Sequence, residues 1–149
     1  MYTNLLVPTD GSKLSGKAFA HALGLALPLK AKIVVLHATP SYKPEMLAEG
    51  GGQLYKRTSK SEYASAAARE AEGIFKGLVS KAAAANVDCK TVLVFADAPW
   101  EAIIAAAKNQ KCDAIVMASH GRRGVSALLL GSEAQKVLTH SKVPVLVVR

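Results

Sequence analysis

The sequence has few of the residues that mark disulfide-rich, metal-binding or base-stacking proteins. Its only cysteines are Cys89 and Cys112, and they form neither a C-x-x-C pair nor a spacing typical of metal ligands. We therefore expect two buried, reduced thiols. Aromatic residues make up 5% of the chain, too few for a platform on which RNA bases stack.

Long apolar runs are also missing. No stretch approaches the roughly 20 apolar residues that a membrane-spanning helix needs. The first residues, M-Y-T-N-L-L-V-P-T-D, have no positively charged start and reach Asp10 after a short apolar run, unlike a signal peptide. These features predict a cytoplasmic protein.

Basic residues outnumber acidic ones by 19 to 11, which gives a net charge of +8. Such a charge attracts phosphate-bearing ligands but does not distinguish a nucleotide from a nucleic acid. The basic residues are scattered, with close groups only at Lys56, Arg57 and Lys60 and at Arg122 and Arg123. Without a long basic stripe, we do not expect a nucleic-acid partner.

Five apolar runs do not alternate with polar residues, which is typical of strands buried on both faces. They are Leu5 to Pro8, Ile33 to His37, Thr91 to Phe95, Ala114 to Ala118 and Val143 to Val148. Segments of helical length and periodicity separate them, from Ser12, a candidate N-cap, to Pro28, and over Ser61 to Ala85, Ala98 to Lys108 and Ser132 to His140.

This alternation predicts one α/β domain over residues 1–149, with a five-stranded parallel sheet and helices on both of its faces. Ligands of such folds lie at the carboxyl ends of the strands, where the strand order reverses. Segments 9–12, 38–60 and 119–130 follow strand ends. Of these, 39–60 contains three consecutive glycines, and it is either a mobile surface loop or a lid or partner contact.

The segment from Met117 to Glu133 is the strongest candidate for a ligand site. Gly121 and Gly124 would allow the backbone to approach a ligand, and Gly131 with Ser132 opens a helix whose free amides and dipole favour phosphate. Alternatively, the glycines serve only turns and Ser132 is only a helix cap.

Asp10 and His120 are predicted to lie at the same edge of the sheet. Asp10 would bind a base or ribose, or hold Mg²⁺ through a water, unless it is simply a turn residue. His120 would donate to phosphate or act as an acid or base. No nucleophile with a matching base can be assembled, and G-x-x-x-x-G-K-[ST] is absent, so the chain is not an ordinary P-loop hydrolase.

The sequence resembles the universal stress protein family over essentially the whole chain, and five segments carry the resemblance. They are L-V-P-T-D-G-S, V-V-L-H-A, A-P-W-E-A-I-I, S-H-G-R-R-G and V-P-V-L-V-V-R. The resemblance implies a Rossmann-like fold of the adenine nucleotide alpha hydrolase type. It also implies binding of ATP, AMP or ADP, possible Mg²⁺, and a homodimer through Val143 to Val148.

The family pattern for ATP binding is Gly, two residues, Gly, nine residues, Gly, then Ser or Thr. Gly121, Gly131 and Ser132 fit this pattern, whereas Ala118 replaces its first glycine and adds a methyl group near the nucleotide. By resemblance, Pro8, Thr9 and Asp10 border the adenine, Ala38 offers its backbone to the base, and Met117 packs against it. The same resemblance places His120, Gly121, Gly131, Ser132 and the Glu133 amide at the ribose and phosphates. Independently of the resemblance, the charges of Arg122 and Arg123 would lie at the rim.

Three functions follow from these residues. The first is a nucleotide-binding regulatory protein of the stress response. The second is a slow ATP hydrolase that uses Asp10, His120 and a metal ion. The third is a dimeric interaction protein that has lost nucleotide binding through Ala118.

Overall fold

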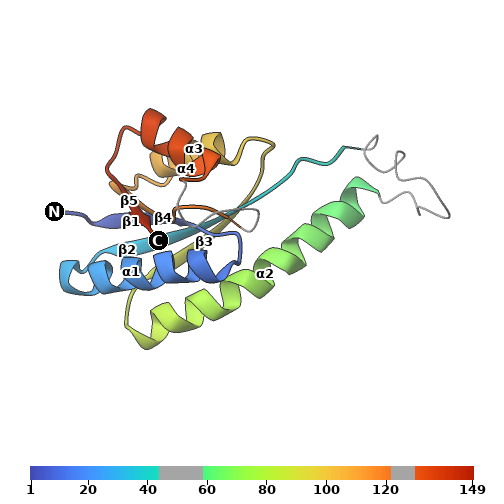
Figure 1. The fold of residues 1–149 in the computed structure, drawn as a ribbon. Coiled ribbons are helices and arrows are strands. Elements are labelled where there is room, and N and C mark those ends of the chain that lie inside the picture. Colours follow the sequence, from blue (N-terminus) through green and yellow to red (C-terminus); the bar gives the residue numbers. More distant parts are fainter. Residues whose placement is uncertain (44–58, 122–129) are drawn as a thin grey trace.

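The computed structural model describes residues 1–43, 59–121 and 130–149, in which strands and helices alternate (Figure 1). In chain order the elements are β1 (Asn4–Pro8), α1 (Lys13–Leu29), β2 (Lys32–Thr39), α2 (Lys60–Ala84), β3 (Cys89–Phe95), α3 (Pro99–Asn109), β4 (Ala114–Ala118), α4 (Ser132–His140) and β5 (Val145–Val148). Within the described ranges, no helix is both long and apolar enough to cross a membrane.

The five strands form one parallel sheet in the order β3-β2-β1-β4-β5. Helices α1 and α2 cover one face and α3 and α4 the other (Figure 1). On the first face, Phe19 of α1 and Leu78 of α2 pack against Val35 of β2. On the other face, Ile103 of α3 and Val137 of α4 pack against the strand residues that alternate with those of the first face. The predicted α/β fold is confirmed.

Local signals in the sequence set several element boundaries. The side chain of Ser12 accepts a hydrogen bond from the Ser15 amide and caps α1, as predicted. Beyond α2, Asn86 takes a left-handed conformation with φ 55°, which ends the helix. Strand β5 starts two residues later than predicted, after Pro144.

The prediction of strands buried on both faces is correct for the three central strands and wrong for β3 and β5. These two are the edges of the sheet, so a helix covers each of them only in part. Phe95 and Leu146 are 46% and 44% exposed. For the same reason Cys89 on β3 is only half-buried, whereas Cys112 is buried as expected.

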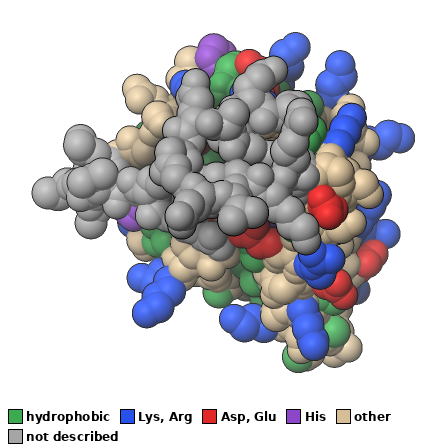
Figure 2. Space-filling view, turned by 90° about the vertical axis from the view of Figure 1, so that its right-hand side faces the viewer, with side chains coloured by type: hydrophobic (Ala, Val, Ile, Leu, Met, Phe, Trp, Pro, Cys, Tyr) green, Lys and Arg blue, Asp and Glu red, His purple; other side chains and the backbone are tan. Residues whose placement is uncertain are grey.

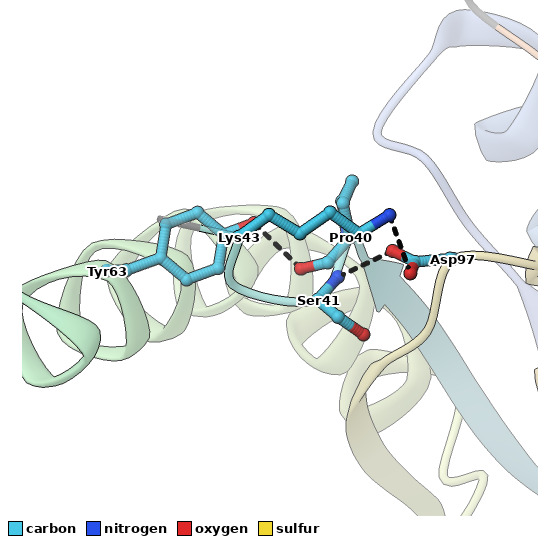
Figure 3. A network of polar contacts seen from close by, with 5 residues as sticks. All are labelled: Pro40, Ser41, Lys43, Tyr63 and Asp97. Atoms are coloured by element: carbon cyan, nitrogen blue, oxygen red, sulfur yellow. Dashed lines mark hydrogen bonds and ion pairs between the residues drawn. The ribbon is translucent and has the colours of Figure 1, made fainter. Parts of the chain in front are cut away.

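The chain after β2 is tied to two neighbouring elements at the carboxyl edge of the sheet (Figure 3). Tyr63 of α2 donates through its hydroxyl to the Pro40 carbonyl at 2.7 Å. Asp97, beyond β3, accepts from the Ser41 amide at 3.1 Å and pairs with Lys43 at 2.9 Å. The Lys43 side chain, with help from the Ser41 amide, lowers the pKa of Asp97. These contacts fix residues 40–43, whereas most of the predicted 39–60 loop lies outside the described residues.

Candidate functional site at the carboxyl edge of the sheet

The sheet is only partly joined where its strand order reverses, between β1 and β4. Their ladder covers two residue pairs, Leu5 with Ala114 and Leu6 with Ile115. By contrast, β1 pairs with β2 over five residues. The carboxyl-terminal parts of β1 and β4 therefore lie beyond their common ladder, at the position where folds of this kind bind ligands.

Pro8 explains why the β1–β4 ladder is short. Backbone groups of alternate residues in a strand point to opposite neighbours. The Thr9 amide donates to Leu36 of β2 at 2.8 Å, and the Asn4 carbonyl accepts from Asp113, just before β4, at 2.9 Å. The nitrogen of Pro8 thus faces β4, and it has no hydrogen to donate. The predicted site residue Pro8 ends pairing on this side and leaves the two strand ends unjoined.

The turn after β1 is held by its own side chains. Asp10 Oδ1 accepts from the Ser12 amide at 3.0 Å, as in an Asx turn. Thr9 is buried, and its Oγ1 accepts from the Gly11 amide at 3.1 Å and lies 3.0 Å from Ser15 Oγ. These contacts commit the Thr9 hydroxyl to the turn. The side chain of Asp10 is half-buried.

Gly121 brings the loop after β4 against the turn after β1. A Cβ atom on Gly121 would lie 2.9 Å from Asp10 Oδ2, so only glycine fits beside this carboxylate without a shift. The adjacent His120 has its Nδ1 3.1 Å from Ser119 Oγ. Sequence segments more than one hundred residues apart in the chain thus meet, as the topology predicted.

Gly131 closes the same loop. Its amide donates to the Ser119 carbonyl at 2.8 Å. A Cβ on Gly131 would lie 3.0 Å from that carbonyl oxygen and 3.1 Å from the Cα of His120. Close approach within the protein itself thus favours glycine at both positions: at Gly131 the neighbours are backbone atoms, whereas at Gly121 the neighbour is the end of the Asp10 side chain.

Helix α4 starts beside this closure. Its N-cap is Gly131, so Ser132 is the first helical residue and not the cap that the alternative interpretation assumed. A glycine cap has no side chain to accept from the first-turn amides, which leaves them to other acceptors. The carboxylate of Glu133 points elsewhere: its Oε2 accepts from the Trp100 amide at 2.9 Å, at the start of α3.

Of the other residues predicted for the site, Met117 and Ala118 are the last two of β4, and Ala38 is the last but one of β2. Met117 is buried on the face covered by α3 and α4, and Ala118 packs on the opposite face. Among the described residues other than glycine, positive φ occurs only at Lys30, Asn86 and Lys111. The backbone of Ala118 therefore needs no glycine.

Residues 1–149 match the model of the universal stress protein family. The chain belongs to this family. A universal stress protein of Thermus aquaticus is 32% identical over 152 residues, which cover all of both chains. Another from Methanocaldococcus jannaschii is 30% identical over 150 residues, covering all of this chain and 83% of that protein.

Solved universal stress protein structures share the fold. The protein UspA of Lactobacillus plantarum is 25% identical, has a TM-score of 0.81, and the match covers 99% of this chain and 98% of that one. A universal stress protein solved in complex with cAMP is also 25% identical, with a TM-score of 0.67 and coverage of 99% and 97%. More distant proteins from Archaeoglobus fulgidus and Arabidopsis thaliana, 21% and 20% identical, were solved with dAMP and AMP.

Figure 2 shows the face at the carboxyl ends of the strands. Around the outline of this face, Lys and Arg side chains lie with Asp and Glu side chains between them. Arg122, Arg123 and Gly124 lie outside the described residues. Among the residues that the structure does describe, no group of three or more His, Cys, Asp or Glu side chains could hold a metal ion.

Sequence reasoning treated His37 as an ordinary strand residue of this universal stress protein. The structure joins it to the site: His37 is buried, and its Nδ1 lies 2.8 Å from the carbonyl oxygen of Thr9. The available signal was a lone polar residue inside an apolar strand, directly before the predicted site residue Ala38. A buried polar side chain requires a partner, and the nearest strand end supplies one.

Proposed function

We propose that this universal stress protein binds an adenine nucleotide, AMP or ATP, in the opening between the carboxyl ends of β1 and β4. The observation that carries the proposal is the meeting of Asp10 with Gly121 where the β1–β4 ladder stops. The relatives solved with cAMP, dAMP and AMP support the ligand class.

In this proposal the base lies between the strand ends. Backbone alternation turns the amide and carbonyl of Ala118 toward β1, because the Ser119 amide donates the opposite way, to Val148 of β5. Polar backbone groups then flank the base on the β4 side, and Ala38 serves it from β2. Met117 forms part of the apolar floor.

The phosphates would lie at the start of α4. The amides of Ser132 and Glu133 are in its first turn, where the helix dipole favours negative charge. His120 and Gly121 would contact the ribose and phosphates, with Arg122 at the rim. With ATP, Mg²⁺ would be held mainly by the phosphates and by Asp10 through a water, since a carboxylate oxygen suits this cation.

Isothermal titration with AMP, ATP and GTP tests the proposal. We expect AMP and ATP to bind with dissociation constants below about 1 mM and GTP to bind more weakly, because the backbone pattern at the strand ends reads the base. No heat of binding with either adenine nucleotide at millimolar concentration would refute the proposal. It would instead favour a protein that acts only through interactions.

We further propose that the nucleotide serves regulation in the stress response, in a cytoplasmic homodimer formed along β5. Two features support these assignments. Both cysteines are free, which suits a reducing compartment. The outer edge of β5 carries the half-exposed Leu146, and an edge strand of this kind invites pairing with a second copy.

A further inference from the structure

His37 makes a hydrogen bond whose direction is determined by chemistry. Its side chain is 7% exposed, and Nδ1 lies 2.8 Å from the carbonyl oxygen of Thr9. A carbonyl oxygen only accepts, so Nδ1 carries the hydrogen and donates it. The ring is therefore either the Nδ1–H tautomer or the cation.

This bond occupies the place of the next rung between β1 and β2. The paired residues of the two strands end at Pro8 and Leu36, and the Thr9 amide then donates to the Leu36 carbonyl. By alternation, the amide of Ala38 is the next donor that β2 points toward β1, and its natural acceptor would be the Thr9 carbonyl. His37 supplies the donor to that carbonyl instead.

We infer that His37 is a positioning residue of the nucleotide site: by holding the Thr9 carbonyl toward its own ring, it stops the β1–β2 ladder and keeps the Ala38 amide available to the base. The inference rests on the proposed function, and it adds a residue that does not itself touch the ligand. It also explains why the pairing of β1 stops on the β2 side of the proposed site. Pro8 ends pairing toward β4, and His37 ends it toward β2.

Neighbouring contacts hold the His37 ring in this position. Phe75 of α2 meets it edge to face, with ring centroids 6.5 Å apart and planes at 85°. The side chain of Thr9 is held as well, because its Oγ1 accepts from the Gly11 amide. The His37 ring thus links α2 to the turn that carries Asp10, in addition to the side-chain contacts within the turn.

Two substitutions at His37 distinguish the effect of losing the hydrogen-bond donor from the effect of changing the size of the side chain. His37→Leu removes the donor, and we expect AMP to bind about tenfold more weakly, the size of one net hydrogen bond. His37→Asn retains an N–H near the position of Nδ1 and should restore most of the affinity. Val35→Ala is the matched control, since Val35 is buried on the same face of β2. It should lower the melting temperature without changing AMP affinity.

Amide hydrogen exchange of Ala38 provides a readout that a purely structural role would not change. In the free wild-type protein this amide should exchange rapidly, and AMP should protect it. In free His37→Leu, Ala38 should instead donate to Thr9 and become protected without ligand. Rapid exchange in both free proteins would overturn the inference, as would equal AMP affinity of wild type and His37→Leu.

The proposed function and the role of His37 can be tested separately. If wild-type protein binds no adenine nucleotide, the proposed function is wrong, yet the exchange of Ala38 in the two free proteins still tests what His37 does to the ladder. If wild type binds AMP and His37→Leu binds it equally well, the function stands and the positioning role falls.

Discussion

Gly121 has no space for a side chain because Asp10 stands against it. In Gly121→Ala the new Cβ would lie 2.9 Å from Asp10 Oδ2, so the carboxylate or the loop must move. Because both belong to the proposed site, we expect AMP to bind about tenfold more weakly, as for the loss of one hydrogen bond. Isothermal titration measures the change. Gly24→Ala is the control, since its Cβ would meet nothing within 4 Å; equal losses in both variants would contradict this account.

Because the thiol of Cys112 is buried, we expect the free energy of unfolding to fall at alkaline pH. Burial, followed by the nearby charge of Asp113, raises the pKa of its thiol from 9.0 to about 11. The unfolded thiol ionises first, so its contribution to folding is complete below pH 9.0 and is lost as the pH rises through about 11. Urea unfolding at about pH 8 and about pH 10 should show a decline that Cys112→Ala reduces. An identical decline in the variant would exclude the thiol as its source.

Some residues of the proposed site can be recognised from the sequence because they follow strand ends, whereas others depend on which strands are neighbours. Asp10 and Gly121 follow strand ends, so the alternation of strand and helix is enough to bring them to one edge. Pro8 and His37 act through the direction of backbone groups, which depends on which strands are neighbours. The strand order 3-2-1-4-5 cannot be obtained from the alternation alone.

At the scale of elements, helix α3 depends on a cap from another helix. Its N-cap residue, Ala98, makes no side-chain hydrogen bond, and Glu133 of α4 accepts from the Trp100 amide instead. Rings of Trp100 and His140, 4.8 Å apart, pack the same two helices together. Sequence reasoning assigned Glu133 only through its amide, because no local pattern reveals a cap supplied from 33 residues away.

We expect Glu133→Ala to lower the free energy of unfolding by about 1 kcal/mol, the usual cost of losing a helix cap. Glu133→Gln keeps an oxygen acceptor and should lose less. Chemical denaturation measures both effects. AMP affinity should be the same in both variants and the wild type, because only the backbone amide of residue 133 is assigned to phosphate. Loss of AMP binding without loss of stability would assign the carboxylate to the ligand.

Element boundaries follow the sequence closely where a local signal is recognised, as at Ser12 and Asn86, whereas the start of β5, after Pro144, lies two residues later than predicted. Burial of whole strands follows it less well. The run Thr91 to Phe95 is as apolar as a central strand, yet β3 lies at the edge with Phe95 46% exposed. An apolar composition indicates that a strand can be buried, whereas the position of the strand in the sheet decides whether it is buried.

At the scale of the whole molecule, the proposed homodimer makes β5 an interior strand. A charge on an edge strand opposes such pairing. We therefore expect wild-type protein to be a dimer and Leu146→Glu a monomer in size-exclusion chromatography with light scattering. Leu27→Glu changes an exposed leucine of α1, 58% exposed, and should remain dimeric. A monomeric wild type, or a dimeric Leu146→Glu, would place the contact elsewhere or remove it.

One hydrogen bond connects the loop after β4 to the edge strand β5. The amide of Ser119, the first residue after β4, donates to the carbonyl of Val148 at the end of β5. Ser119 also receives the Gly131 amide that closes the loop, so the loop entrance and the outer border of the sheet share a residue. In the proposed dimer, a nucleotide held by that loop would lie with only β5 between β4 and the second subunit. Because a two-fold axis makes the two β5 strands antiparallel, the two ligands would lie at opposite ends of the paired strands.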